Sequence, residues 1–314
     1  MKEQDMLQDL QQPVTDLRRR FIELTEPHRE ALWSYAHRIT GNAIDAEDLV
    51  QDTLLRAFAK LGYLGQALHV RAYLFKMATH IWIRQQMRNP AWETETMIPD
   101  DQGESPLCSF ELGDILGWLI QVLPPKQRAC FLLSTSFDFS NKEIAEMLQT
   151  TEGTIKSYLH RARKTLAARA TQTNPTKETC LYKEVPSGVL QQYVRAFQAG
   201  DVAGLLHLID EDASMHIMGD WEEYGKTQIK NNSLHYWSQE QLERKAVYGM
   251  LDGVPVLFGL RKNASGDMVL RELMQIHHNG TSIQSIHWYY FSLDLIRYAA
   301  AELGMACITE GYQG

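Results

Sequence analysis

The chain has 314 residues, of which 44% are hydrophobic, and it carries a formal net charge of −8 at pH 7. This length is too great for one small core and predicts two or three domains. No apolar run is as long as a membrane span, and the first residues lack the apolar segment of a signal peptide, so we expect a cytoplasmic protein without a membrane partner. The four cysteines form no CxxC pair, so we expect neither a disulfide framework nor a zinc site. No other metal and no cofactor is expected.

The charge is distributed unevenly along the chain. Between Arg88 and Lys126 there is no Lys or Arg but seven acidic residues. The stretch 150–166, TTEGTIKSYLHRARKTL, instead contains four Lys or Arg and a single acid, Glu152. A local basic patch of this kind in an acidic protein indicates contact with phosphate groups.

Three helices are predicted in the N-terminal part. Apolar residues recur at helical spacing over residues 16–40 and 45–61, and a third helix is expected over about 69–88, after a short loop at 62–69. The first helix has these candidate core positions: Leu17, Phe21, Leu24, Leu32, Tyr35 and Ile39. Residues 15–90 are therefore predicted to form a helical domain, followed by an acidic linker at 91–112 that has little periodicity.

A second helical unit is predicted over residues 113–170. Ser140 and Glu143 form a capping box at the start of a short helix, and the three residues QTT connect that helix to the basic one. On a helical wheel the basic helix has one narrow apolar stripe, opposite its cationic face: Ile155, Leu159, Ala162 and Leu166. A solvated surface helix is the plain alternative, but the capped helix and tight turn favour a DNA-binding helix-turn-helix.

The rest of the chain changes character after a second linker at 171–186. Residues 187–304 begin with two helices broken at AGD and end with the helix LDLIRYAAAEL. Between them are five strand-like runs: 213–219, 244–251, 254–262, 267–278 and 282–291. Turn signals separate several of these runs, at LDG (251–253) and at NG (279–280). Strands that follow one another directly predict antiparallel pairing and an α+β domain.

Two blocks of the sequence resemble one known family. LPPKQRACFLL…FSNKEIAEMLQTTEGTIKSYLHRARKTL resembles region 4, and AIDAEDLVQDTLLRAFAKL…VRAYLFKMATHIWIRQQMR resembles region 2, of extracytoplasmic-function sigma factors of the sigma-70 family. The blocks stand in the family's order, with a linker between them. The resemblance implies two all-α sigma domains, a region 2 helical bundle (15–90) and a region 4 helix-turn-helix (113–170). The implied partners are core RNA polymerase and promoter DNA.

The resemblance also implies roles for particular side chains. The exposed polar face of helix 45–61 would dock on core polymerase through Glu47, Asp48, Gln51 and Asp52, although such a face is more often only solvated. The −10 element would be melted and held by loop 62–69 and helix 69–88, through Tyr63, Arg71, Lys76, His80, Arg84 and Arg88. The −35 element would be read by Lys156, Ser157, His160 and Arg161, with phosphates contacted by Arg128, Lys142, Arg163 and Lys164. Three of the chain's residues differ from those common in the family, so the promoter sequence is left open: His80, Arg84 and Tyr158.

The C-terminal stretch VLQQYVRAFQAGDVAGLLHLIDEDASMHI, with the strands after it, resembles a SnoaL-like domain of the cone-shaped ketosteroid-isomerase type. A pocket in that fold would be lined by Trp221, Tyr224, Tyr248, Phe258, His287 and Tyr289, although alternating aromatic residues are usually core. Acid or base groups would be Asp212, His216 and His287, but no spacing singles them out. We therefore expect a regulatory domain that contacts the sigma regions within the chain, and no catalytic residue.

Two other functions stay open at this point. One is a stand-alone helix-turn-helix regulator that binds duplex DNA without polymerase, against which the region 2 block argues. The other is a SnoaL-type enzyme or ligand sensor fused to a DNA-binding arm.

Overall fold

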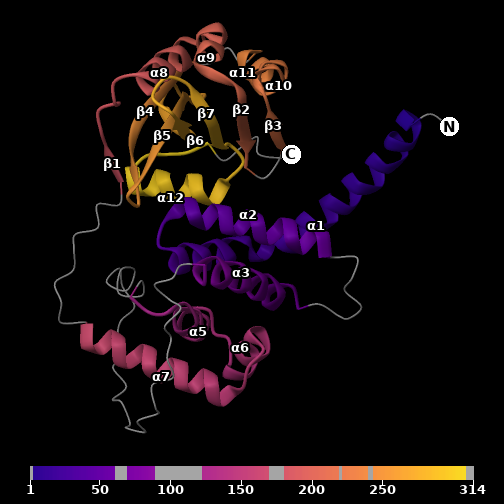
Figure 1. The fold of residues 1–314 in the computed structure, drawn as a ribbon, viewed down its shortest axis with the longest axis vertical. Coiled ribbons are helices and arrows are strands. Elements are labelled where there is room, and N and C mark those ends of the chain that lie inside the picture. The colour runs from indigo at the N-terminus through magenta and orange to yellow at the C-terminus, as the bar shows by residue number, and fades with distance from the viewer. Residues whose placement is uncertain are drawn as a thin grey trace. The chain divides into compact units, whose positions relative to one another are not determined.

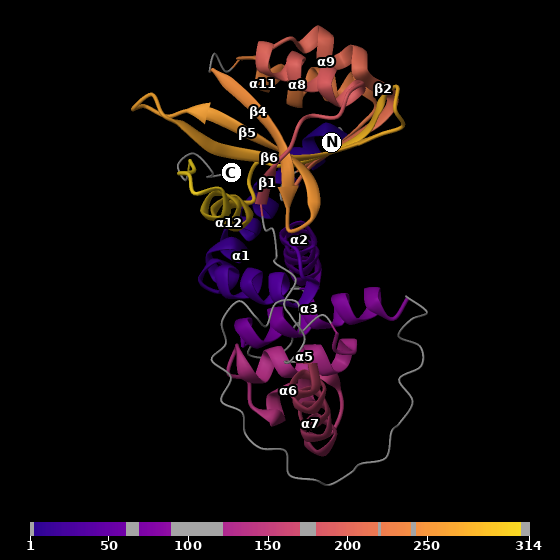
Figure 2. The ribbon, with the colours of Figure 1, turned by 90° about the vertical axis from the view of Figure 1, so that its left-hand side faces the viewer.

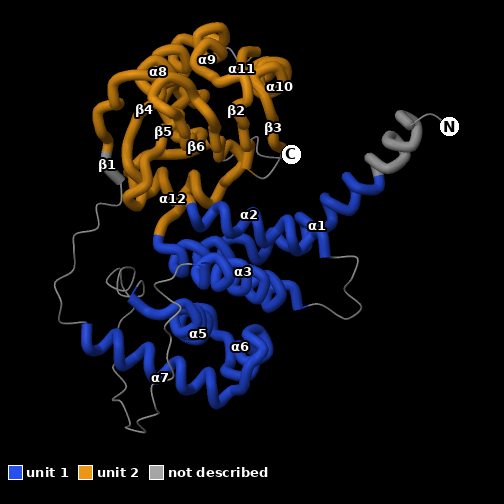
Figure 3. Tube along the Cα trace, in the orientation of Figure 1, with its two compact units in different colours: residues 1–41, 45–175 blue, residues 42–44, 176–314 orange. Residues whose placement is uncertain are grey.

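The computed structural model describes residues 3–60, 69–88, 122–169, 180–218, 221–239 and 243–308, with side chains from residue 13 onward except at 180–181. The chain divides into two compact units (Figure 3): residues 1–41 with 45–175, and residues 42–44 with 176–314. The division at 175/176 falls inside the predicted linker 171–186. Regions 2 and 4, predicted as separate domains, belong to one unit. None of the described helices combines the length and apolar character needed to cross a membrane.

Unit 1 is all helical (Figure 1). Its described helices are α1 (Glu3–Thr40), α2 (Ala43–Lys60), α3 (Val70–Gln86), α5 (Pro125–Thr135), α6 (Asn141–Leu148) and α7 (Glu152–Arg169). The three predicted N-terminal helices are confirmed, although α1 begins well before residue 16. Leu17 and Leu24 were expected in the core but are 46% and 45% exposed, whereas the other four candidate positions of α1 are buried.

The helix-turn-helix is formed by α6 and α7, as the sequence predicts. Ser140 caps α6, since its hydroxyl accepts a hydrogen bond from the Glu143 amide at 3.3 Å while the Glu143 carboxylate accepts from the Ser140 amide at 2.8 Å. Gln149 follows in the left-handed conformation, with φ of 54°, and turns the chain toward α7. The predicted apolar stripe of α7 is fully confirmed, because all four of its residues are buried.

Unit 2 is an α+β domain built on a sheet of seven strands in the order β1-β4-β5-β6-β7-β2-β3. The strands are β1 (Cys180–Tyr182), β2 (Ile209–Ile217), β3 (Trp221–Tyr224), β4 (Arg244–Leu251), β5 (Val254–Lys262), β6 (Met268–His278) and β7 (Ile283–Tyr289). Its helices are α8 (Val189–Ala199), α9 (Val202–Leu208), α10 (Lys226–Asn231), α11 (Ser233–Gln239) and α12 (Leu293–Leu303). In Figure 2, α8, α9 and α11 lie along one face of the sheet, and α12 lies against the other.

The five predicted strands of unit 2 are confirmed within a few residues. The turn LDG is also confirmed, since Asp252 and Gly253 have positive φ of 50° and 84°, as a tight hairpin turn requires. Two short strands were not predicted, and β1 lies inside the expected linker. The expectation of antiparallel pairing holds for every neighbouring pair except β2 and β7, which are parallel. These two strands are distant in sequence, so no local turn signal reports on their pairing.

Candidate nucleic-acid interface

The outer face of α7 is cationic. Lys156, Arg163 and Lys164 are exposed, and none of them has a hydrogen-bond or ion-pair partner among the described residues. His160 and Arg161 are half-buried on the same helix, and Lys142 is exposed on α6. This face is held outward because the opposite stripe is buried. An exposed cationic helix that follows a capped helix and a tight turn has the shape and charge to enter a major groove.

Arg128 does not belong to this face, contrary to the sequence prediction. Its side chain is only 6% exposed. Its Nη1 donates to the Ile39 carbonyl oxygen at 3.1 Å, and its Nη2 donates to the Leu123 carbonyl oxygen at 3.3 Å. The guanidinium carbon lies 5.2 Å from the ring centroid of Trp82. A phosphate cannot reach this guanidinium while it is buried, so its role in the structure is packing.

Some of the candidate −10 side chains of α3 are exposed to solvent, and others contact region 4. Arg71 donates from Nη2 to the Phe137 carbonyl oxygen at 2.6 Å, and its guanidinium lies over the Phe139 ring at 4.6 Å. His80 Nε2 lies 2.6 Å from the Met147 carbonyl oxygen. Arg84 and Arg88 are exposed, and Lys76 is half-buried, whereas Tyr63 lies outside the described residues. In this arrangement two of the five described candidates bind region 4.

An aromatic cluster joins α1 and α3 to the loop between α5 and α6. Phe137 lies 5.4 Å from Tyr35 and 5.2 Å from Phe75, and Phe139 lies 5.2 Å from Phe75, measured between ring centroids. All four rings are buried. We call this contact of α1 and α3 with α5, α6 and their loop the junction. This contact was not predicted from the sequence, although two phenylalanines that flank Asp138 just before a helix cap are a signal for a buried contact.

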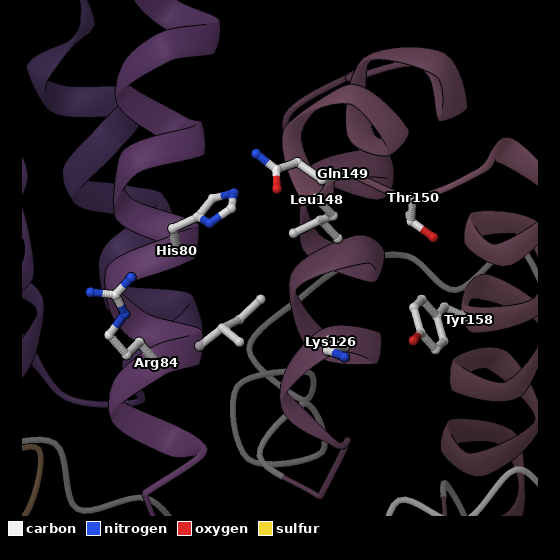
Figure 4. A pocket seen from close by; sticks show the side chains of 8 residues that line it. His80, Arg84, Lys126, Leu148, Gln149, Thr150 and Tyr158 are labelled. Atoms are coloured by element: carbon white, nitrogen blue, oxygen red, sulfur yellow. The ribbon is translucent and has the colours of Figure 1, made fainter.

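A cleft of about 370 Å³ lies beside the junction (Figure 4). His80 projects into it from α3, and Lys126, the α6–α7 turn and Tyr158 border it on the region 4 side. The residues that line the cleft are His80, Ile83, Arg84, Lys126, Leu148, Gln149, Thr150 and Tyr158. This cleft therefore contains residues from both sigma regions, including the three that depart from the family's common residues.

The candidate polymerase-binding residues of α2 are not all exposed. Glu47 is fully buried and accepts hydrogen bonds from Arg29 Nη2 at 3.3 Å, Trp33 Nε1 at 3.1 Å and Gln51 Nε2 at 2.6 Å. Gln51 is also buried. The prediction that these two residues lie on an exposed face is wrong, because α1 supplies donors for the carboxylate. Asp48 and Asp52 are only half-buried and keep their candidate role.

The six candidate pocket residues of unit 2 do not line one pocket. Cross-strand pairing puts Trp221 opposite Ile217 and Tyr248 opposite Leu257, on the face that packs on the helices. The other four lie on the opposite face of the sheet, namely Tyr224, Phe258, His287 and Tyr289. Phe258 and Tyr289 are fully buried and therefore belong to the core, which is the plainer alternative for aromatic residues on strands.

Histidines gather on that second face of the sheet. The His287 ring centroid lies 4.8 Å from that of His216 and 5.3 Å from that of His277. Burial and the two neighbouring imidazoles lower the pKa of His287 to about 4. Glu222 lies 3.4 Å from His216 Nδ1, whereas Asp212 is exposed. Within the described residues, no group of three or more His, Cys, Asp or Glu side chains is arranged to hold a metal ion.

The comparisons with known proteins agree with the two sigma regions. Residues 24–90 match the family Sigma-70 region 2, and residues 115–166 match the family Sigma-70, region 4. The crystal structure of the extracytoplasmic function sigma factor SigJ of Mycobacterium tuberculosis is similar to 85% of this chain over 95% of its own, with 18% identity and a TM-score of 0.31.

Two curated relatives cover different shares of the chain. The ECF RNA polymerase sigma factor SigG of Mycobacterium tuberculosis is 28% identical over an alignment of 236 residues that covers 64% of this chain and 62% of SigG, so the match spans less than two thirds of that relative. The ECF RNA polymerase sigma factor SigL of the same species is 34% identical over an alignment of 145 residues that covers 44% of this chain and 82% of SigL. With both sigma regions matched in order, this chain belongs to the extracytoplasmic-function (ECF) RNA polymerase sigma factors.

Proposed function

We propose that this protein binds core RNA polymerase and directs it to promoters, reading the −35 element through α7 and engaging the −10 element through α3. The observation that carries the proposal is the cationic face of α7, presented by a capped helix-turn-helix, on which Lys156, Arg163 and Lys164 are exposed and have no partner among the described residues. The two matched sigma regions and the names of the relatives SigG and SigL support it. The protein itself catalyses no reaction in this proposal, because the polymerase performs the chemistry.

We infer that the described arrangement of unit 1 is a closed form that must open at a promoter. Arg71 and His80 are candidate −10 contacts, yet both bind backbone carbonyls of region 4. A side chain that donates to a carbonyl in the junction is not available to a displaced DNA strand. Separation of α3 from region 4 therefore precedes, or accompanies, binding of the −10 element.

Run-off transcription with purified core polymerase tests the proposal. We expect specific start sites with core and weak, salt-sensitive DNA binding by the protein alone, since an acidic protein with one basic face gains little from phosphate contacts. Arg161→Ala should lower transcription and relax the −35 preference by about 1–3 kcal/mol if it makes a bidentate base contact. Tight, sequence-specific binding without core would instead identify a stand-alone regulator. Unchanged promoter strength and −35 preference in Arg161→Ala would show that the reading face is assigned incorrectly.

We further propose that residues 187–304 regulate the sigma regions within the chain. The support is the tether: few residues separate α7, which ends at Arg169, from β1, which begins at Cys180. A tether this short gives a high effective concentration, so a weak contact is well populated. The apolar core that packs helices of unit 2 on its sheet contains residues of unit 2 only. A chain that ends at residue 186 should therefore bind core polymerase and differ from the full chain in promoter output. Equal output at every promoter, with no crosslinks between the units, would contradict this regulation.

A further inference from the structure

Two cations and no acid line the cleft beside the junction, among the residues that the structure describes. The eight lining residues include Arg84 and Lys126 but no Asp or Glu. Neither Arg84 nor Lys126 has a hydrogen bond or ion pair with any residue that the structure describes. By contrast, Arg71 and Arg128, in the junction, each donate to a carbonyl oxygen. Two unneutralised cations that share one concave site form a field that attracts an anion.

The remaining polar groups of the cleft are suited to the same ligand. A carbonyl oxygen only accepts hydrogen bonds, so His80 Nε2, at 2.6 Å from the Met147 oxygen, must carry the proton and donate it. That bond fixes the imidazole at the edge of the cleft and uses its Nε2 proton, so the donors left for an anion come from other side chains. Thr150 and Tyr158 contribute hydroxyl groups to the lining, and Gln149 contributes a carboxamide. Figure 4 shows His80 directed from α3 toward Leu148 and Gln149, with Lys126 and Tyr158 bordering the same space.

The geometry points to a binding site for a small anion that carries a phosphate group, an activity separate from promoter reading. Arg and Lys together with hydroxyl donors are the usual partners of phosphate oxygens. A volume of about 370 Å³ exceeds that of a lone phosphate and lies in the range of small-molecule sites. Ile83 and Leu148 give part of the lining an apolar character, which suits the organic portion of a phosphate ester of mononucleotide size.

A ligand in this cleft would stabilise the closed form of unit 1. The lining comes from α3 on one side and from α5, the α6–α7 turn and α7 on the other, so the site is complete only while the junction is intact. A ligand that binds one of two conformations shifts the equilibrium toward that conformation. The anion would therefore oppose the opening on which promoter binding rests in our proposed function. Binding itself requires neither polymerase nor DNA, so it is measured independently of that function.

Calorimetric titration of the full chain with inorganic phosphate and with AMP, at constant ionic strength, tests the site. We expect saturable binding, tighter for AMP, and no binding of adenosine. Lys126→Ala and Arg84→Ala should each weaken binding about tenfold to a hundredfold, the effect of losing one hydrogen bond to a charged group. Arg169→Ala is the matched control, because Arg169 is an exposed cation of α7 outside the cleft. This variant should bind AMP as the parent does.

Three outcomes would overturn the assignment. The first is that neither phosphate nor AMP binds saturably at millimolar concentration. The second is that the Lys126→Ala and Arg84→Ala variants bind as the parent does, which would put any bound anion elsewhere. The third is that a single-stranded oligonucleotide protects His80 and Lys126 from chemical modification while AMP does not, which would assign the cleft to the phosphates of promoter DNA.

Discussion

Replacement of Arg128 by alanine separates the two roles considered for this side chain. The sequence predicts a phosphate contact, whereas the structure buries the guanidinium in the junction, with two carbonyl oxygens and the Trp82 ring as partners. Burial lowers the pKa of Arg128 to about 10, so the group is still charged at neutral pH. A buried charge with these partners contributes to stability, and a surface charge beside DNA contributes to the salt dependence of binding.

The expected loss of stability follows from the contacts of Arg128. A hydrogen bond from a charged donor contributes about 1.5–3 kcal/mol, and the bond to Leu123, at 3.3 Å, is the weaker of the two. The contact with the Trp82 ring contributes about 1–2 kcal/mol at a desolvated site. The cost of burying the charge offsets part of this sum, so we expect Arg128→Ala to destabilise unit 1 by about 3 kcal/mol. This corresponds to a fall in melting temperature of about 6–12 °C.

Two measurements on each variant decide between the roles. Urea unfolding followed by circular dichroism reports stability, and the salt dependence of duplex DNA binding by the protein alone, in its closed form, reports phosphate contacts. The Arg128→Ala protein should unfold at a lower urea concentration than the parent. Its DNA-binding constant K should have the same slope as the parent's in a plot of log K against log [salt]. Lys164→Ala is the matched control: its side chain is exposed, so its stability should be unchanged and its slope should fall by about 0.9. An Arg128→Ala protein with parental stability and a shallower slope would refute the argument.

Three further predictions concern the cap of α6, the histidine cluster and the interior of unit 2. Ser140→Ala removes the capping box and should lower the free energy of unfolding of unit 1 by about 1 kcal/mol, as measured by urea unfolding. His287 has a folded pKa of about 4, below the usual 6.5, because of burial and the adjacent His216 and His277, with Glu222 opposing the shift. As the pH falls, the unfolded chain therefore takes up a proton before the folded one, so unit 2 should lose stability between about pH 6.5 and 4. His287→Gln should make the stability of unit 2 depend less on pH in this range. Equal urea midpoints for variant and parent at both pH 7 and pH 5 would contradict this. In Gly259→Ala the added Cβ would lie 2.4 Å from Cγ of buried Glu272, which is held in place because it accepts hydrogen bonds from Arg261 and Trp288. Urea unfolding should therefore show that the free energy of unfolding falls by about 1–3 kcal/mol. Gly153→Ala is the control and should show no such fall, because the nearest neighbour of its added Cβ lies at 3.7 Å.

The sequence by itself determined the family and the longer elements, but not the short β1, β3, α10 and α11. The apolar stripe of α7, the capping box at Ser140 and the hairpin turn at Asp252 and Gly253 are all as predicted. These features depend on residues no more than four apart along the chain or on the periodicity of one helix, so local spacing carries the information. The cationic face of α7 follows in the same way, because a helix that buries one stripe must expose the other.

Only the tertiary structure decided which polar residues stay accessible. Arg128 is separated by 89 positions from Ile39, whose carbonyl oxygen it binds, and His80 by 67 positions from Met147. Nothing in the spacing of the sequence brings such partners together. Glu47 was expected on the exposed polar face of its helix, and it is buried because donors on α1 satisfy its carboxylate. The burial of a charged or polar side chain is set by the partners that a neighbouring element supplies, and those partners come together only when the chain has folded.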